Sequence, residues 1–395
     1  MKRKIRVGIL GLGRAGRNMH APELALSPEL FEIVAGCDNA PDRRRELPRQ
    51  FDNTTLYASL EEMLADDRVE MVTIATRNLD HTPQAIAALN AGKYAVVDKP
   101  VAVTLEQADA LDAAARTYPG KLFFRHNRRF EPAFCHVRQL MNSGIIGHIN
   151  MVKIYRHPGF VRRLDWQTLC ECKGGMFNNW GPHLVDQALQ LLDAPVADLW
   201  CDLQHNVTAG DADDQVKLLL RGANGRVVDV EVSTTTTLPG RLYEVWGDRG
   251  TLVVPVEEKA IQLRYLDPAQ KLKPLKAVSG NFPLAYGNPD ETLKFVDEER
   301  PIDPGSGHIL QRGKVLAPGE SIDPSQGYTY PDTMWGHIYA DIVDGVPYPV
   351  TIAQGLAVAR TIERARQASK YKPHESLLSG TTVHVLKGDR GNEKS

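Results

Sequence analysis

The chain has 395 residues, of which 42% are hydrophobic and 24% charged, and its formal net charge at pH 7 is -2. This length predicts two or three domains, and the composition is that of a folded protein rather than a disordered one. A net charge so close to zero excludes a broad basic surface, so we expect no nucleic-acid partner. The longest apolar runs are far shorter than the roughly 20 residues of a membrane-spanning helix, so we expect no membrane partner.

The cysteines give no sign of a disulfide framework or a metal site. They stand at positions 37, 135, 170, 172 and 201, an odd number with no CxxC spacing. This pattern favours a reducing compartment and no bound metal. The N-terminus is basic, but its apolar run is short and rich in glycine, unlike a secretory signal. We therefore expect a cytoplasmic protein.

Residues 1–128 alternate short β-rich runs with segments of helical periodicity, which predicts βαβ units and a parallel sheet. The expected strands are 4–10, 31–37, 54–59, 69–76, 94–98 and 121–126, with helices at 59–66, 81–93 and 104–118 among the connections. The expected fold class is therefore α/β, with a dinucleotide-binding domain at the N-terminus.

Residues 129–385 are expected to form a second domain of the α+β class. A helix at about 132–141 opens it, and strands at 150–156, 198–208, 215–221, 226–237, 241–247 and 250–256 predict a large, mostly antiparallel sheet. The stretch 267–331 is dense in Pro, Gly, Asp and Glu, which indicates an irregular insertion. Helices at 334–345 and 353–369 follow, and residues 386–395 are expected to be a tail.

A GxGxxG motif directly follows the first expected strand, with its glycines at Gly11, Gly13 and Gly16. The first glycine permits a tight turn, the second lets the backbone approach a pyrophosphate, and the third allows the next helix to pack closely on the strand. Arg14 and Ala15 stand inside this turn, where helix N-terminal amides would face the phosphates. Glycine-rich turns also occur for purely structural reasons, so the motif alone is a weak signal.

Asp38 supplies the second half of a dinucleotide-binding pattern. It ends the second expected strand, 22 residues after Gly16, where its carboxylate would accept hydrogen bonds from ribose hydroxyls. Since a carboxylate would repel a 2′-phosphate, Asp38 favours NAD over NADP as the cofactor. The arginines at 43–45 point the other way. They could bind that phosphate or form a solvated helix start, and we favour the second interpretation.

Two polar groups, ATRN at 75–78 with His81 and DKP at 98–100, follow later strands of the same domain. Ligands of open α/β sheets bind at the carboxyl ends of the strands. Lys99 there could hold a substrate hydroxyl and favour the alkoxide that develops as a hydride leaves. An ordinary turn at the end of a strand is the alternative interpretation of this lysine.

Together these motifs resemble the Gfo/Idh/MocA oxidoreductases, relatives of glucose-fructose oxidoreductase and inositol dehydrogenase. The resemblance rests on GLGRAG, ATRNLDH, AALNAGKYAVVDKP, HNRRFEPAF, SGIIGHI and GGMFNNWGPHLVDQALQLL, and it covers the chain outside 267–331 and the tail. It implies cofactor contacts from Thr76, His81, Asn127 and Lys99. It also implies a homo-oligomer, a dimer or a tetramer, that associates through the sheet of the second domain.

In this family a lysine of an EKP motif and a histidine of the second domain lie beside the nicotinamide, and the matching residues here are Lys99 and His183. Asp98 replaces the usual glutamate. Where the family commonly has an aspartate four residues before the histidine, this chain has Asn179, which cannot act as a base but can hydrogen-bond sugar hydroxyls. The acid–base role then falls to His183. Asp186 is either its orienting partner or a buried capping carboxylate.

Further side chains of the second domain are candidates for contact with the substrate. Arg163, with Asp165 and Trp166, stands just before a glycine pair, where the family often contacts cofactor or substrate. Tyr155 follows a strand and could bind a substrate hydroxyl or simply lie on the sheet. Trp180 could be a core aromatic or a platform for a sugar face.

These residues predict an NAD-dependent dehydrogenase acting on a secondary alcohol of a sugar, cyclitol or sugar derivative. Lys99 would polarise the hydroxyl, His183 would accept its proton, and Asn179 would orient the ring. One alternative is redox-neutral glycoside cleavage, in which transient oxidation at C3 permits elimination while NAD stays bound. Another is a non-catalytic NAD or sugar sensor, since the exchange of aspartate for asparagine could mark a loss of activity.

Overall fold

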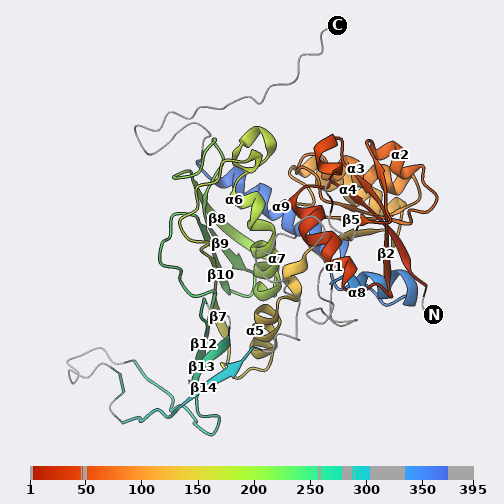
Figure 1. Cartoon of the computed structure of the whole chain (residues 1–395). Coiled ribbons are helices and arrows are strands. Elements are labelled where there is room, and N and C mark those ends of the chain that lie inside the picture. The colour runs from red at the N-terminus through yellow and green to blue at the C-terminus, as the bar shows by residue number, and fades with distance from the viewer. Residues whose placement is uncertain are drawn as a thin grey trace.

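The structure is a computed structural model that describes residues 3–45, 47, 51–256, 259–277, 287–288, 290–302 and 334–371. It contains two sheets, with helices on both faces of the first and helices packed between the two (Figure 1). The first sheet lies at the right of that view. The second stands nearly edge-on at the left, and its outer face carries no helix in the described part of the chain.

Six parallel strands form the first sheet, in the order β3-β2-β1-β4-β5-β6. They are β1 Ile5–Leu10, β2 Phe31–Cys37, β3 Thr55–Tyr57, β4 Met71–Ile74, β5 Tyr94–Val97 and β6 Leu122–Phe124. This is the strand order of a Rossmann fold, in which the direction of winding reverses between β1 and β4 and leaves a crevice at their carboxyl ends. The predicted α/β domain is confirmed.

The connections of this sheet are helical. They are η1 Gly16–His20, α1 Ala21–Ala25, η2 Pro41–Arg44, α2 Leu60–Leu64, α3 His81–Asn90 and α4 Leu105–Thr117. The helix after the glycine turn begins as one π-helical turn, η1, and continues as α1. At α2 a capping box fixes the start, because the Ser59 hydroxyl accepts the Glu62 N–H and the Glu62 carboxylate accepts the Ser59 N–H.

Eight strands form the second sheet, in the order β14-β13-β12-β11-β7-β10-β9-β8. They are β7 Ile149–Arg156, β8 Val196–Gln204, β9 Gln215–Gly222, β10 Val227–Ser233, β11 Tyr243–Gly247, β12 Gly250–Val254, β13 Ala260–Leu266 and β14 Phe295–Pro301. Only the β7–β10 pair is parallel among these described strands, so the expected, mostly antiparallel sheet is confirmed.

The expectation that 267–331 is irregular is wrong at residues 295–301, because these form β14 at the edge of the sheet. An edge strand has few buried side chains, and the acid-rich sequence of β14 concealed its extended structure. Residues 278–286, 289 and 303–331 of the predicted insertion, and the predicted tail at 386–395, lie outside the described residues.

The remaining helices connect the two sheets. They are η4 Asn127–Phe130, α5 Pro132–Asn142, η5 Trp166–Thr168, η6 Cys170–Cys172, α6 Met176–Asn179, α7 Gly181–Leu192, α8 Met334–Tyr339, η9 Ala340–Asp344 and α9 Ile352–Ala368. In Figure 1, α5, α7 and α9 lie between the second sheet and the first. No helix in the described ranges has both the length and the apolar character needed to cross a membrane.

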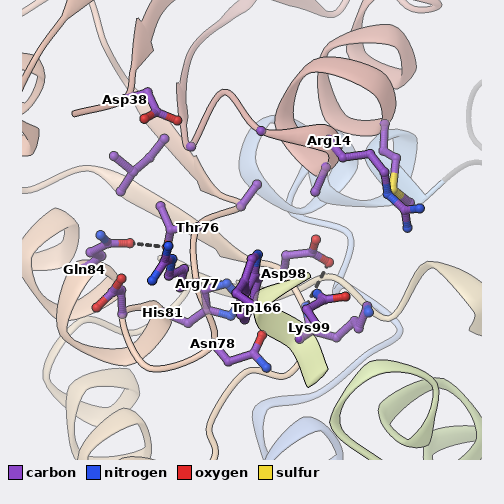
Figure 2. Close-up of a pocket in the computed structure, with 18 of the residues that line it drawn as sticks. Arg14, Asp38, Thr76, Arg77, Asn78, His81, Gln84, Asp98, Lys99 and Trp166 are labelled. Atoms are coloured by element: carbon purple, nitrogen blue, oxygen red, sulfur yellow. Dashed lines mark hydrogen bonds between the residues drawn. The ribbon is translucent and has the colours of Figure 1, made fainter. Parts of the chain in front are cut away.

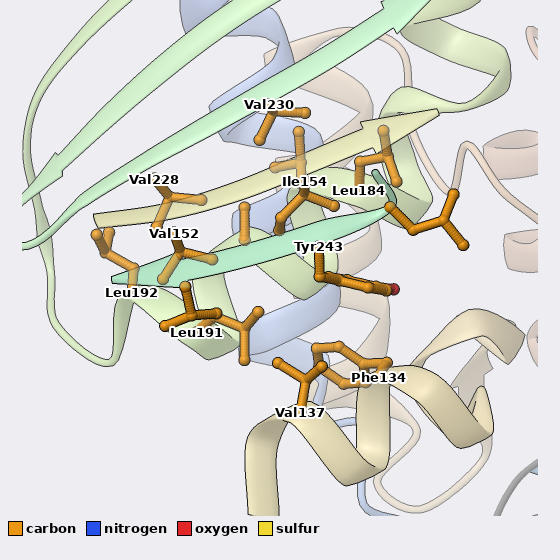
Figure 3. Close-up of a cluster of buried hydrophobic side chains, with 14 of the residues drawn as sticks. Phe134, Val137, Val152, Ile154, Leu184, Leu191, Leu192, Val228, Val230 and Tyr243 are labelled. Carbon is orange, nitrogen blue, oxygen red and sulfur yellow. The ribbon is translucent and has the colours of Figure 1, made fainter. Parts of the chain in front are cut away.

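The inner face of the second sheet is apolar where α5 and α7 cover it (Figure 3). Along β7 and β10 buried residues alternate with less buried ones, because successive side chains of a strand point to opposite faces. Val152 and Ile154 therefore point toward Leu184 of α7 and Phe134 of α5, and all four are fully buried. The intervening residues, which include Tyr155, lie on the outer face.

Helix α8 packs on the first sheet although it comes late in the chain. Trp335 and Tyr339 both meet the Phe31 ring edge-on, with centroids 6.0 Å apart in each case. A single cut between residues 128 and 129 therefore separates α8 from the sheet on which it packs, and the predicted domain boundaries stay a prediction.

Candidate functional site

A cleft of about 1000 Å³ lies at the carboxyl ends of the first sheet and is closed by residues of the second domain (Figure 2). Most of the predicted site residues line it: Gly11, Gly13, Arg14, Ala15, Asp38, Thr76, His81, Lys99, Asn127, Arg163, Asn179 and His183. Gly16 and Tyr155 do not. The fold thus brings together side chains that are up to 172 residues apart in sequence, from Gly11 to His183.

The glycine turn presents bare backbone to this cleft. Gly11 has φ +93°, and a Cβ there would lie 2.6 Å from the carbonyl oxygen of Ala75. A Cβ on Gly16 would lie 1.9 Å from the Gly11 carbonyl oxygen, so Gly16 lets η1 pack against the turn without lining the cleft. At Gly13 a Cβ would point toward the Arg43 side chain, which also lines the cleft. These are the roles that a dinucleotide-binding turn requires.

Asp38 is fixed at the opposite side of the turn. Its carboxylate accepts the Leu12 N–H at 2.9 Å and the Ala40 N–H at 3.0 Å. Arg43 Nη1 lies 3.6 Å from Asp38 Oδ2, and the Arg44 guanidinium donates to the Asp38 backbone carbonyl. The arginine run therefore folds back on Asp38 through η2, and the half-exposed Arg43 borders the space where an adenosine ribose would lie.

Thr76 and His81 hold the floor of the cleft. The Thr76 hydroxyl donates to Gln84 Oε1 (Figure 2). His81 Nδ1 lies 2.8 Å from the carbonyl oxygen of Pro100, and burial lowers the pKa of His81. A neutral His81 thus links the start of α3 to Pro100, the residue that follows Lys99 through a cis peptide bond. Direct contact of either residue with a cofactor stays a prediction.

Lys99 reaches across the cleft from the first domain to the second. Its backbone N–H donates to Asp98 Oδ1 at 2.8 Å, and its Nζ donates to the backbone carbonyl of Asn179 at 2.8 Å. Burial lowers the pKa of Lys99 to about 8, an effect opposed by Asp98 and reinforced by Arg125. Near neutral pH the ammonium form predominates, but the proton is held less tightly than on an exposed lysine.

A break between α6 and α7 makes the Asn179 carbonyl available to Lys99. The His183 N–H bonds to the Trp180 carbonyl at 3.0 Å rather than to the carbonyl of Asn179. Pro182 interrupts the helix one residue earlier, because it has no N–H for the carbonyl of Asn178. The Asn179 side chain in turn donates to Gln167 Oε1 at 2.8 Å. The two halves of this residue therefore join Lys99 to the loop that carries η5.

His183 stands at the first turn of α7. Burial lowers its pKa well below the usual value, and the nearby positive charges of Lys99 and Arg128 add to the effect. Its Nδ1 has no hydrogen-bond partner among the described residues, and its ring meets the Trp180 ring edge-on at 6.0 Å. A neutral, buried imidazole with a free ring nitrogen can accept a proton.

Asp186 does not orient His183 in the described structure. Its carboxylate pairs with the Arg129 guanidinium, and Arg129 Nε lies 3.0 Å from Asp186 Oδ2. Within the described residues, Asp186 forms no hydrogen bond with His183. Of the two interpretations of Asp186, a buried structural carboxylate fits the contacts. Trp180 lines the cleft and also packs on the apolar core of the second sheet. The Arg128 guanidinium lies over its ring, 4.5 Å from the ring centre.

The loop between β7 and α6 closes the cleft from the side of the second domain. The Arg77 guanidinium lies 5.8 Å from the centre of the Trp166 ring, and Asn78 Nδ2 donates to the Lys173 carbonyl at 2.7 Å. Arg163 pairs with Asp165 at 2.7 Å. The Arg77–Trp166 contact and the Asn78–Lys173 hydrogen bond join the two domains across the cleft, whereas the Arg163–Asp165 pair lies within the second domain.

Arg77, Arg128 and Gln167 are among the lining residues that were not proposed as site residues from the sequence. Arg77 and Arg128 stand inside the ATRN and HNRRFEPAF motifs, and their charge was the available signal. Gln167 follows Trp166 directly, but only the fold places its amide between Arg163 and Asn179.

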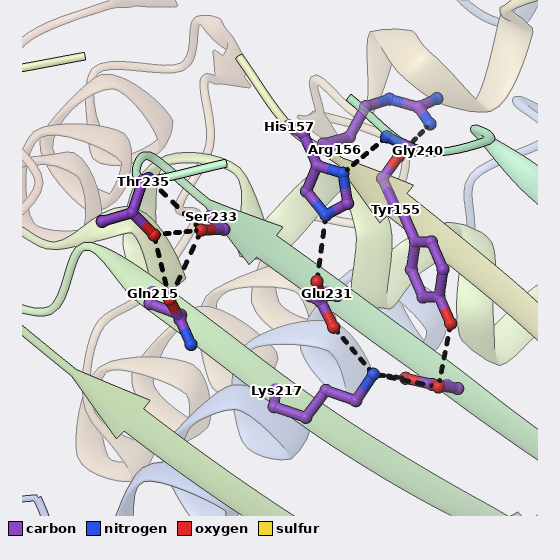
Figure 4. A network of polar contacts seen from close by, with 10 residues as sticks. Tyr155, Arg156, His157, Gln215, Lys217, Glu231, Ser233, Thr235 and Gly240 are labelled. Atoms are coloured by element: carbon purple, nitrogen blue, oxygen red, sulfur yellow. Dashed lines mark hydrogen bonds and ion pairs between the residues drawn. The ribbon is translucent and has the colours of Figure 1, made fainter. Parts of the chain in front are cut away.

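Tyr155 lies away from the cleft, on the outer face of the second sheet (Figure 4). Its hydroxyl donates to Asp229 at 3.2 Å, its ring stacks on His157 at 5.7 Å, and Lys217 Nζ lies 5.2 Å from its centre. The alternation of β7 explains the difference, because the neighbouring Arg156 takes the inward position. A contact between Tyr155 and a substrate in this subunit's cleft is therefore not supported.

Within the described ranges, no three His, Cys, Asp or Glu side chains are grouped so that they could hold a metal ion. The five cysteines are all free thiols.

Comparison with known proteins points in one direction. A family model described as "Oxidoreductase family, NAD-binding Rossmann fold" matches residues 5–126, and one described as "GFO/IDH/MocA C-terminal domain" matches residues 134–253. The chain is 30% identical to the uncharacterized oxidoreductase YdgJ of Escherichia coli, over 64% of this chain and 72% of that protein. It is 27% identical to scyllo-inositol 2-dehydrogenase (NADP(+)) IolW of Bacillus subtilis, over 93% and 94% respectively.

Solved structures share the fold. Levoglucosan dehydrogenase in complex with NADH and levoglucosan matches with a TM-score of 0.69 at 20% identity, covering 93% of this chain and 97% of that one.

Proposed function

The chain belongs to the GFO/IDH/MocA family of oxidoreductases and binds NAD through its Rossmann domain, and we propose that it oxidises a secondary hydroxyl of a sugar, cyclitol or sugar derivative. The observation that carries this proposal is the 2.8 Å bond between Lys99 Nζ and the Asn179 carbonyl, in a cleft that also holds His183. An ammonium group and a neutral imidazole thus line the same cleft where the two domains join.

The cofactor would be held by the glycine turn and Asp38. Gly11 permits the tight turn and the bare backbone at Gly13 would let a pyrophosphate approach, while the Asp38 carboxylate borders the place of the adenosine ribose. When bound, NAD supplies a nicotinamide C4 that accepts the hydride. The presence of Asp38 supports NAD over NADP, and the position of Arg43 beside it makes this preference open to direct test.

The chain's own residues would divide the remaining work. The Lys99 ammonium donates a hydrogen bond to the substrate oxygen in place of the Asn179 carbonyl, which stabilises the negative charge that develops there. Neutral His183 accepts the hydroxyl proton. The side-chain amide of Asn179, already bonded to Gln167, can orient the ring through its hydroxyls.

Purified protein mixed with NAD and a panel of sugars, glycosides and inositols tests the proposal, with NADH absorbance as the readout. We expect NADH to form with at least one neutral or derivatised polyol. Release of an aglycone without net NADH would instead indicate the redox-neutral glycoside cleavage. Binding of NAD and sugar with neither outcome would indicate the sensor, against which the presence of both Lys99 and His183 argues.

The cytoplasmic location and the homo-oligomeric state expected from the sequence stay predictions. A small-molecule polyol remains the proposed partner of the cleft.

A further inference from the structure

A cluster of three ionisable side chains and a histidine is buried next to Lys99. Arg125 is 0% exposed, His20 0%, Glu23 4% and Asp98 5%. Taking a charged group out of water is costly, and apolar side chains of similar size would often stabilise a core equally well. None of these four groups binds the cofactor or transfers a proton in the proposed function. Their place next to the lysine therefore calls for another explanation.

The contacts of the cluster converge on Asp98. Its Oδ1 accepts the Lys99 N–H at 2.8 Å and lies 3.3 Å from Arg125 Nη1, while its Oδ2 lies 3.3 Å from His20 Nε2. The Asp98 carboxylate is thus held from three sides. It fixes the peptide that leads into the Lys99 side chain.

Arg125 connects this carboxylate to the rest of the fold. Its second nitrogen pairs with the Glu23 carboxylate, which also accepts the Trp335 indole N–H at 2.7 Å. His20 is fixed in the same way, because its Nδ1 lies 2.6 Å from the Thr73 hydroxyl. The strand ends β4, β5 and β6, helix α1 and helix α8 therefore all hold the cluster in place.

We propose that Asp98 and Arg125 are positioning residues for Lys99, which fix the direction of its side chain and set the balance of charge around its ammonium group. This inference rests on the proposed function, in which Lys99 must be protonated when the hydride leaves. It assigns to Asp98 and Arg125 no contact with the substrate.

The charges that face Lys99 come from every element around it. Asp98 is the negative neighbour, while Arg125 from the end of β6, Arg14 from the glycine turn and Arg128 from η4 are positive. His183 of α7 faces it as well. Burial lowers the pKa of Lys99 to about 8, Asp98 opposes this effect, and Arg125 is the strongest of the three cations that reinforce it.

The two charges therefore predict opposite shifts. Asp98→Asn removes the negative charge that favours the ammonium form, so the pKa of Lys99 should fall. Arg125→Met removes a positive charge, so the pKa should rise. Each shift should be on the order of one pH unit, as for other charge pairs at close range. General damage to the fold would not move the lysine in opposite directions.

The test measures Lys99 directly in the full-length protein without NAD. Trace labelling with an amine-reactive reagent at a series of pH values, followed by mass spectrometry of the Lys99 peptide, gives the midpoint of its titration. We expect a midpoint near 8 in the wild type, a lower one in Asp98→Asn and a higher one in Arg125→Met. Arg125→Lys and Asp98→Glu keep the charges and should stay within about 0.3 units of the wild type, a small fraction of the shift expected from losing a charge.

A control and a fallback keep the outcome unambiguous. Arg366→Met removes a cation that pairs with Asp213 at 3.1 Å in the second domain, and it should leave the Lys99 midpoint unchanged. If Arg125→Met does not fold, the pair Asp98→Asn and Asp98→Glu still tests the sign. Shifts in the same direction, or no shift, overturn the inference. Opposite shifts in a protein that oxidises no polyol would keep the inference and reject the proposed function.

Discussion

Lys99 spans the cleft at the residue scale, since its ammonium group bonds to the second domain while its backbone belongs to the first. Lys99→Met should lower kcat by about 100-fold to 1000-fold, the effect of losing one donor to a developing oxyanion. The Kd for NAD, measured by fluorescence titration, should change by less than about threefold, because that binding relies on the glycine turn. Lys93→Met serves as a matched control, since its Nζ bonds to the Asp66 carbonyl outside the cleft. Wild-type turnover in Lys99→Met would contradict the assignment.

His183 and Lys99 together predict the pH dependence. The pKa of His183 is lowered well below its usual value, so this base is already neutral at pH 6.5 and above. The pKa of Lys99 is lowered to about 8, so its ammonium form is present below that pH and lost above it. We therefore expect kcat/KM to stay level between pH 6.5 and 7.5 and to fall above about 8.

Steady-state rates at saturating NAD measure this profile. His183→Asn should lower kcat by about 100-fold or more, the usual contribution of a general base. A rate that climbs continuously through pH 9 would mean that the deprotonated lysine is the active form.

Asp38 and Arg43 decide between the two nicotinamide cofactors. Asp38→Ser removes the carboxylate that borders the ribose, so kcat/KM with NAD should fall by about tenfold or more while the ratio for NADP over NAD rises. In Arg43→Ala the Asp38 carboxylate loses its 3.6 Å ion pair. The activity of this variant with NADP should therefore fall below that of the wild type. Activities with both cofactors measure these ratios. An increase in NADP use in Arg43→Ala would show that the arginine does not favour the phosphate.

At the scale of elements, the break between α6 and α7 positions both catalytic candidates. Pro182→Ala restores a backbone N–H that can bond to the Asn178 carbonyl, which permits a continuous helix. In that helix the next N–H, that of His183, would bond to the Asn179 carbonyl. Lys99 Nζ would then lose its present acceptor and His183 would turn about the helix axis. We expect a roughly tenfold fall in kcat or more, since small displacements of catalytic groups are costly.

A matched variant separates this effect from helix stability. Pro132→Ala changes the first residue of α5, which lines no part of the cleft, and should leave kcat within about twofold of the wild type. Turnover of Pro182→Ala equal to that of Pro132→Ala would show that the break is not needed.

The elements themselves were predictable to different degrees. The six strands of the first sheet could be predicted because each is a short apolar run bounded by turn residues, and the glycine motif placed the cleft. β14 could not, because charged residues interrupt it and its pairing with β13 decides its structure. β13 has one charged residue, Arg264, within an alternating pattern that is typical of a strand, but it was not predicted.

The limits at the site were of the same kind. Lys99, Asn179 and His183 were predicted and do line one cleft. The inward position of Arg156 instead of Tyr155 depends on the register of β7, which a sequence does not show. The pairing of Asp186 with Arg129, 57 residues away, depends on how α7 packs against η4.

At the scale of the whole molecule, helix α9 belongs to both domains (Figure 1). Leu356 packs in the core of the first sheet, whereas Val358 and Ile362 pack in the core of the second. Arg360 adds an ion pair of 2.9 Å to Asp109 of α4. One helix thus contacts both walls of the cleft, and any change in the angle between the domains must move one of these two cores.

The outer face of the second sheet is the remaining large feature, and it bears on the oligomeric state. Its charged side chains already pair with one another, as Lys217 does with Glu231 at 2.8 Å and Lys153 with Glu244 at 3.6 Å. Two of the aromatic side chains on it are exposed: Trp200 is 54% exposed and Trp246 38%. A flat surface with paired charges and exposed aromatic rings is typical of a protein–protein interface.

We therefore expect the wild type to be a dimer or a tetramer that associates through this face. Light scattering coupled to size-exclusion chromatography should show the protomer mass only for the double variant Trp200→Glu and Trp246→Glu, because two buried carboxylates on each subunit would oppose association. Val346→Glu places the same charge at a residue that is 53% exposed and lies just after η9, away from the sheet, and should leave the mass unchanged. A monomeric wild type at micromolar concentration would reject the interface. A double variant that stays oligomeric would move it to another surface.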